Sequence, residues 1–168
     1  MPISTDTLNT LNLTELELTA ALVKDVQDVF STMLGVGDIT HIPAQAELPD
    51  TCSSTCLTAM VGMAGRYCGL VSVKLPMPLA LSFTSLMLDM EVTEINGDVH
   101  DAMGEIANMI GGSFKQHLSK AGDDVRLSTP SVVSGSCFTV STGSKTDDIT
   151  IDLKSGTEMF AVSLTIER

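Results

Sequence analysis

The chain has 168 residues, of which 43% are hydrophobic and 18% are charged. This composition argues against a disordered segment and favours a single domain with a well-filled core. The formal net charge of −12 disfavours nucleic acid and anionic membranes as partners, because both reward clustered Lys and Arg side chains. A basic surface on another protein suits this charge better. No apolar run is long enough to span a membrane and no basic stretch precedes an apolar N-terminal block, so we expect a cytoplasmic protein without membrane insertion.

The N-terminal part predicts a leader followed by a long helix. Residues 1–13 are rich in Thr, Asn and Leu without a clear period, and we expect a flexible leader ahead of a single domain at residues 14–168. Thr14 is expected to cap a helix, with Glu17 completing a capping box and Gly35 ending it. Apolar residues recur at helical spacing in between: Leu18, Leu22, Val26, Val29, Phe30 and Met33.

The next segments predict an edge strand, a hairpin and a short helix. Two prolines within residues 40–49 favour a connecting or edge segment. Residues 56–63 and 67–75 are apolar and read as antiparallel strands joined by a tight turn. Pro78 then opens a short apolar helix that extends to Leu88, because proline costs least at the start of a helix.

Residues 98–120 predict a second long helix, which we expect to end near Gly122. At about 100° per residue, its apolar side chains form one stripe: Val99, Met103, Ile106, Ile110 and Phe114. A polar stripe lies opposite: Asp101, Glu105, Asn108, Gly112 and Ser119. The apolar stripe is expected to dock on the core, which leaves the acidic and amide side chains facing outward.

The remaining chain predicts strands rich in β-branched residues, separated by Gly and Ser turns. They are expected at residues 127–133, 136–142, 148–153 and 159–166. The predicted fold class is therefore α+β, with two long helices and a short helix packed on a mainly antiparallel sheet of about six strands. Long strands near the C-terminus could present an edge that a second copy covers, so we expect a homodimer.

Most catalytic motifs are missing from the chain. There is no P-loop, no G-x-G-x-x-G after a strand, no G-x-S-x-G elbow and no H-E-x-x-H. His41 and His100 are scattered, and His117 is expected to be a core or boundary residue rather than a base or ligand. Cys52 and Cys56 lack a nearby His at metal-ligand spacing, so packing cysteines are favoured over a metal site. We expect no metal or cofactor of the protein's own.

The polar stripe has two readings. A solvated helix face normally carries Asp, Glu and Asn, which would explain Asp101, Glu105 and Asn108 without any function. Against that reading, three glycines stand inside the same helix, and each costs about 1 kcal/mol relative to Ala. They are Gly104, Gly111 and Gly112. A helix that tolerates such losses usually gains close approach by a neighbouring backbone or by a partner.

The same residues carry a resemblance to a known family. The stretch reads Glu105-Ile-Ala-Asn108-Met-Ile-Gly111-Gly112, with Asp101 one turn earlier and Pro130 in a later strand. This pattern resembles the D/S-x3-E-x2-N stretch and following proline of the CheC/CheX/FliY chemotaxis phosphatases, and the chain looks most like CheX. Relatives of the CheC type carry a second E-x2-N on the first long helix. Here Asp25 and Asp28 have that spacing without an Asn, and we expect solvated helix residues rather than a second site.

The resemblance implies a protein phosphatase that hydrolyses the aspartyl phosphate of a response regulator, phospho-CheY or a CheY-like receiver. Asn108 would orient the attacking water, and Glu105 would pair with the receiver's active-site lysine. The receiver would supply Mg²⁺. Asp101 and Pro130 are expected to support the helix.

The resemblance also implies a role for two glycines of the second long helix. Gly111 and Gly112 would leave room near the contact with the receiver. A non-catalytic scaffold or sensor that binds the regulator is the main alternative. A hydrolase that uses Asp101 and Glu105 as paired carboxylates is a weaker one, since both lie on one exposed face.

Overall fold

A computed structural model describes residues 3–43, 54–119, 124–136, 138–143 and 145–167. The described residues contain four helices and seven strands. The helices are α1 (Thr5–Leu11), α2 (Glu15–Leu34), α3 (Met77–Leu88) and α4 (Gly97–Leu118). The strands are β1 (Thr40–Ile42), β2 (Cys56–Gly65), β3 (Gly69–Pro76), β4 (Val125–Leu127), β5 (Ser131–Gly135), β6 (Thr146–Ser155) and β7 (Glu158–Glu167). This architecture confirms the predicted α+β class.

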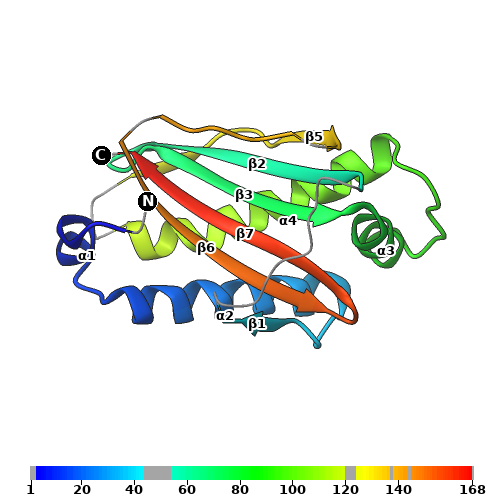
Figure 1. The fold of residues 1–168 in the computed structure, drawn as a ribbon, viewed down its shortest axis with the longest axis horizontal. Coiled ribbons are helices and arrows are strands. Elements are labelled where there is room, and N and C mark those ends of the chain that lie inside the picture. Colours follow the sequence, from blue (N-terminus) through cyan, green and yellow to red (C-terminus); the bar gives the residue numbers. More distant parts are fainter. Residues whose placement is uncertain (1–2, 44–53, 120–123, 137, 144, 168) are drawn as a thin grey trace.

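The strands form one antiparallel sheet in the order β1-β6-β7-β3-β2-β4, with β5 also paired to β2. Helix α4 packs against β2 and β3, α2 packs against α4 and β6, and α3 contacts the end of the same layer. Figure 1 shows α4 crossing one face of the sheet, with α3 and the start of α4 at the end opposite both termini. α4 therefore packs against both the sheet and α2.

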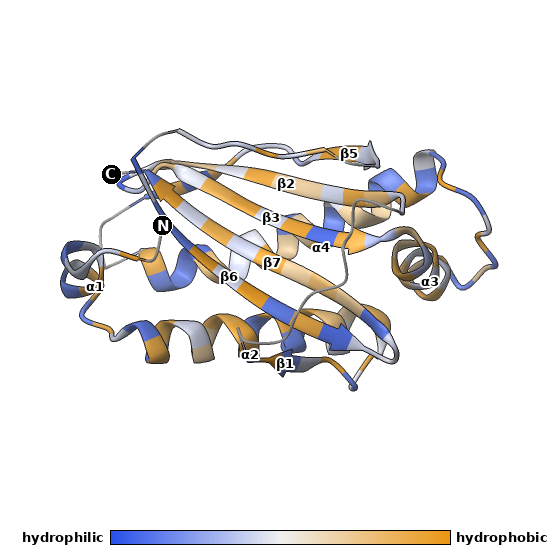
Figure 2. Ribbon diagram, in the orientation of Figure 1, coloured by the Kyte–Doolittle hydropathy of each residue, from blue (hydrophilic) through white to orange (hydrophobic). Residues whose placement is uncertain are grey.

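The core lies between the sheet and these helices. Buried and partly exposed residues alternate along β3 and β7, and Figure 2 shows the matching alternation of hydrophobic and polar residues, as expected when one sheet face packs on helices. Phe30 of α2, Phe83 of α3 and Phe160 of β7 form an aromatic cluster with ring centroids 4.8–6.1 Å apart. This cluster joins two helices to the start of β7.

Several predicted element boundaries are confirmed, and each has a local cause. Thr14 caps α2 by accepting a hydrogen bond from the Glu17 N–H, and the Glu17 carboxylate accepts one from the Thr14 N–H, which is the predicted capping box. Gly35 ends α2 with φ +66°, a conformation that glycine adopts without strain. Pro78 lies in the first turn of α3. The edge segment expected at residues 40–49 contains β1, and its remainder from residue 44 lies outside the described residues.

Residues 3–13 differ from the flexible leader that was expected. They contain α1, and the side chains of Ile3 and Leu11 are buried in the core. The hydroxyls of Ser4 and Thr7 donate hydrogen bonds of 2.7 and 2.6 Å to the carboxylate of Asp147, which is fully buried on β6. Since a buried carboxylate requires donors, α1 is part of the packed structure.

The strand prediction for residues 127–133 is wrong in one respect, because two short strands replace one long strand. Both β4 and β5 pair with β2, and residues 128–130 interrupt them. Pro130 has no N–H to donate to a ladder. Ser128 fills part of the gap, since its N–H donates to the Gly62 carbonyl and its Oγ accepts from the Gly62 N–H.

A strand at residues 136–142 is also absent among those of its residues that the structure describes. The predicted C-terminal edge is present only in part. β7 is internal, between β6 and β3, while β6 pairs with β1 only over residues 152–154. The homodimer therefore stays a prediction. In the described part of the chain, no helix is both long and apolar enough to cross a membrane.

Candidate functional site

The site is built on α4, a helix of 22 residues. The Asn96 side chain caps it by accepting a hydrogen bond from the Val99 N–H at 3.2 Å. The five residues of the predicted apolar stripe are at most 1% exposed. α4 ends at Leu118, and the stop expected near Gly122 lies outside the described residues. Capping and burial together fix the rotation of the helix, and so the direction of every outward side chain.

The predicted polar stripe faces outward. Asp101 and Glu105 are exposed, and Asn108 is half-buried one turn further along. The structure shows no hydrogen bond or ion pair between any of these three side chains and another described residue. Their polar groups are therefore free to interact with a second molecule.

A groove of about 420 Å³ adjoins this stripe. It is lined by His100, Asp101, Gly104, Glu105, Pro130 and Val132. The structure thus brings Pro130 together with Asp101 and Glu105, although Pro130 comes from the break between β4 and β5. Asn108 lies outside the groove lining, as do Gly111 and Gly112.

Gly104 explains how the helix and the proline come so close. A Cβ atom at Gly104 would lie 3.3 Å from Pro130 Cγ and 3.4 Å from Pro130 Cβ, tighter than ordinary packing. The glycine therefore permits the approach of a neighbouring segment, which was one of the two explanations left open. The sequence signalled this only through the cost of a glycine inside a helix.

The other two glycines of α4 have different surroundings. Gly111 is buried, and a Cβ there would meet Leu127 Cδ1 at 3.5 Å and Val61 Cγ1 at 3.6 Å. It therefore faces the sheet, contrary to the expectation that it leaves room beside a partner. At Gly112, no atom from another described segment lies within 4 Å of the Cβ position, which faces open space.

His100 is a site residue that the sequence did not reveal. Its ring lines the groove, and its Nε2 is buried without a hydrogen-bond partner among the described residues. An isolated His next to an acidic residue carries no recognisable spacing, so only the packing of α4 against residues 130–132 identifies it.

The surface around the site is strongly acidic. No Lys or Arg occurs between Lys74 and Lys115. The same stretch holds Asp89, Glu91, Glu94, Asp98, Asp101 and Glu105. Among the described residues, no group of three His, Cys, Asp or Glu side chains could hold a metal ion. Cys56 is buried and Cys68 is exposed, and Cys52 lies outside the described residues.

Residues 57–154 match a family model described as chemotaxis phosphatase CheX. The match covers more than half of the chain and includes Glu105, Asn108 and Pro130. The chain belongs to the CheX family. The CheY-P phosphatase CheX of Thermotoga maritima is 28% identical over 119 residues, which cover 68% of this chain and 74% of the relative.

Solved CheX structures share the fold. CheX from Desulfovibrio desulfuricans is 31% identical with a TM-score of 0.71, covering 90% of this chain and 99% of that one. The CheX–CheY–BeF3–Mg²⁺ complex from Borrelia burgdorferi contains a chain that is 18% identical with a TM-score of 0.72, covering 89% and 97%. At this level of identity, the similarity to the Borrelia burgdorferi chain shows a shared fold alone.

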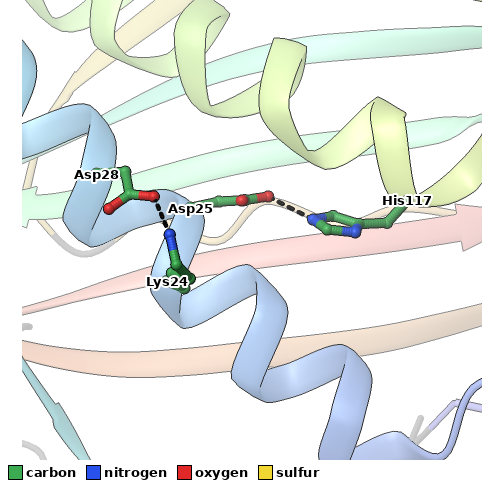
Figure 3. Close-up of polar contacts among 4 residues, drawn as sticks. All are labelled: Lys24, Asp25, Asp28 and His117. Carbon is green, nitrogen blue, oxygen red and sulfur yellow. Dashed lines mark hydrogen bonds and ion pairs between the residues drawn. The ribbon is translucent and has the colours of Figure 1, made fainter.

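In this CheX-family chain, Asp25 on α2 is not the solvated helix residue that was expected. His117 Nε2 of α4 lies 2.7 Å from Asp25 Oδ2, and the Asp25 side chain is only 20% exposed (Figure 3). Asp25 is therefore an interhelical contact residue rather than a solvated one. Asp28 is exposed as predicted, and its hydrogen bond raises the pKa of Lys24 above the usual value. His117 is half-buried, at the boundary of the core, as predicted.

Proposed function

We propose that this protein hydrolyses the aspartyl phosphate of a response regulator, phospho-CheY or a CheY-like receiver. The observation that carries the proposal is the pair of uncommitted side chains, Glu105 and Asn108, one turn apart on a capped and tightly packed helix. Membership of the CheX family supports the reaction class. The composition of the Borrelia burgdorferi complex supports a CheY-like partner that carries Mg²⁺.

The proposed chemistry requires little of the phosphatase itself. Water attacks the phosphorus atom in line with the receiver's aspartate, a phosphorus–oxygen bond to water forms, and the bond to the aspartate carboxylate breaks. Inorganic phosphate and a free aspartate result. Since phosphoryl transfer rewards positioning and charge stabilisation, a protein without a nucleophile of its own can accelerate it.

Asn108 is the residue that would position the water. Its amide oxygen can accept a hydrogen bond from the water, which orients an oxygen lone pair toward phosphorus. A neutral amide does this without repelling the phosphoryl oxygens, as a carboxylate would. Asn108 is half-buried with no partner among the described residues, so its orientation is restricted while its polar group stays available.

Glu105 would hold the partner. It is exposed and has no cation beside it in the described structure, so its carboxylate can form a charge-assisted hydrogen bond with the receiver's lysine. Asp101 lines the same groove and adds negative charge. Pro130 would support the helix by packing against it at Gly104, and Gly111 would let the helix lie close to Leu127 and Val61 of the sheet. Because Gly112 has no side chain, nothing protrudes from the outer surface of α4 at this position, and the receiver could approach the helix closely.

A phosphate-release assay over a panel of phosphorylated receivers tests the proposal. The parent protein should accelerate release from at least one receiver, and Asn108→Ala should nearly abolish the acceleration while the circular dichroism spectrum is unchanged. Gln116→Ala is the matched control, because it removes an exposed amide from the same helix and should leave the rate unchanged.

Two results would contradict the proposed function. If the parent bound a phosphorylated receiver without accelerating loss of phosphate, the protein would be a scaffold or sensor. If Asn108→Ala released phosphate as fast as the parent, Asn108 would have no part in positioning the water.

A further inference from the structure

A second surface with the properties of a binding site lies at the end of α3. Of the seven large hydrophobic side chains that the described residues expose, three fall between residues 86 and 90. They are Leu86, Leu88 and Met90, at 51%, 41% and 55% exposure. A groove of about 560 Å³ adjoins two of them and is lined by Ser82, Ser85, Leu86, Asp89, Met90 and Glu91. We call this the α3 groove.

The loop that presents Met90 has a defined conformation. The N–H groups of Asp89 and Met90 both donate to the carbonyl of Ser85, and Ser85 Oγ accepts from the Val92 N–H at 3.0 Å. Val92 is 9% exposed and belongs to the core. The backbone is anchored on both sides of Met90 and therefore holds its side chain in a solvent-exposed position. Exposed apolar side chains grouped on fixed backbone typically mark an interaction surface.

We propose that the α3 groove is a second contact surface for the receiver and accepts an apolar side chain flanked by Lys or Arg. The inference rests on the proposed function. The negative charge of the groove favours a basic segment as its occupant. Asp89 and Glu91 line the groove, and no Lys or Arg occurs between Lys74 and Lys115. A second copy of this chain is a poorer occupant, since a two-fold interface would face the same acidic groove with itself.

One receiver can reach both surfaces. Residues 91–97 span at most about 21 Å when fully extended, and α4 rises about 12 Å from Gly97 to Glu105. The α3 groove and Glu105 are therefore within about 33 Å, close to the width of an interface that buries about 800 Å² per partner. Helix α3 packs against α4, and Figure 1 shows α3 at the same end of the molecule as the start of α4.

Contacts in the α3 groove would select the receiver without taking part in the chemistry. An apolar anchor far from the reacting atoms stabilises the bound ground state and the transition state equally. Its loss therefore raises KM and leaves kcat unchanged. This split separates the groove residues from Asn108, whose removal should lower kcat.

Steady-state phosphate release by a Leu86→Ser/Met90→Ser variant tests the inference. We expect KM for the phosphorylated receiver to rise about tenfold or more, with kcat within about twofold of the parent. Leu16→Ser is the matched control. Leu16 is 80% exposed near the start of α2, at the opposite end of the molecule from α3 (Figure 1), so its removal should leave both constants unchanged.

A charge reversal provides an independent variant should the double substitution fail to fold. Glu91→Lys should raise KM severalfold, and added salt should reduce the difference from the parent because exposed charges are screened. Activity of the parent separates the two proposals: if no receiver is dephosphorylated by the parent, the proposed function fails. If the parent is active and both variants keep its KM, the inference is overturned. A loss of dimer mass in light scattering with unchanged KM would assign the groove to a second copy instead, which also overturns it.

Discussion

His117 and Asp25 join the two long helices, with His117 Nε2 2.7 Å from Asp25 Oδ2 although the residues are 92 positions apart (Figure 3). The contact crosses the boundary between α4 and α2 and is largely shielded from water. It also occupies the position on α2 where the resemblance would allow a second E-x2-N site. Asp25 thus contributes to the packing of α2 against α4.

Truncation of either side chain in this contact, Asp25 or His117, should destabilise the fold. We expect Asp25→Ala and His117→Ala each to lower the free energy of unfolding by about 1–2 kcal/mol, because a partly buried polar group then loses its partner. Urea unfolding measures this, and the double variant should be less destabilised than the sum of the two. Asp28→Ala is the control, since its exposed pair with Lys24 is worth at most about 0.5 kcal/mol. Full additivity would disprove the coupling.

Neutralising Glu105 should weaken receiver binding more than neutralising Asp101. Glu105→Gln keeps the shape of the side chain and removes its charge, and we expect about a tenfold loss of affinity because a charge-assisted contact to the receiver's lysine is lost. The affinity of this variant should also depend less on salt. Calorimetric titration with a phosphorylated receiver measures both effects. Equal losses in Glu105→Gln and Asp101→Asn would point to a diffuse acidic surface.

Substitution of Gly112 should separate stability from function. Its Cβ position is open, so Gly112→Ala should raise the free energy of unfolding by up to about 1 kcal/mol through helix propensity. The added methyl group lies on the outer surface of α4 and should slow phosphate release. Gly104→Val is the contrast, because it collides with Pro130 and should destabilise by about 1–3 kcal/mol. A stabilised Gly112→Ala with parental activity would show that no partner approaches this position closely.

Asp152 gives the stability an expected pH dependence. Burial raises the pKa of its carboxyl, and the charge of His41 opposes this in part. A raised pKa in the folded state means that ionised Asp152 destabilises the fold, so its contribution improves as pH falls from neutral through the folded pKa toward the unfolded value. Asp152→Asn should therefore be more stable than the parent at pH 7, with the advantage shrinking in acid. Chemical denaturation at several pH values measures this, and an advantage that grew in acid would reverse the sign.

Deletion of residues 1–12 tests whether α1 belongs to the domain. Ile3 and Leu11 are buried, and Ser4 and Thr7 donate to the buried carboxylate of Asp147. We expect the deletion to lower the free energy of unfolding by at least about 3 kcal/mol, from lost apolar burial and lost donors. Equilibrium urea unfolding of both proteins is the measurement. An unchanged midpoint would show that this segment is a loosely tethered leader.

The features predicted correctly from sequence are those with local causes. The capping box at Thr14, Pro78 in the first turn of α3 and the apolar period of α4 each act within a few residues. The misjudged features depend on distant partners. α1 has only 7 residues, too few for a clear period, and it is held by Asp147. The break before β5 is made by Pro130 together with the side chain of Ser128 bonded to Gly62.

The sequence by itself determined that Asp101, Glu105 and Asn108 share the outer face of one helix, because rotation of about 100° per residue follows from local backbone geometry. Only the tertiary structure decided what surrounds them. It placed Pro130 and His100 in one groove with Glu105, turned Gly111 inward while leaving Gly112 open, and paired Asp25 with His117. Most of these relationships join residues remote in the chain, and they arise when burial of the shared core brings the elements together.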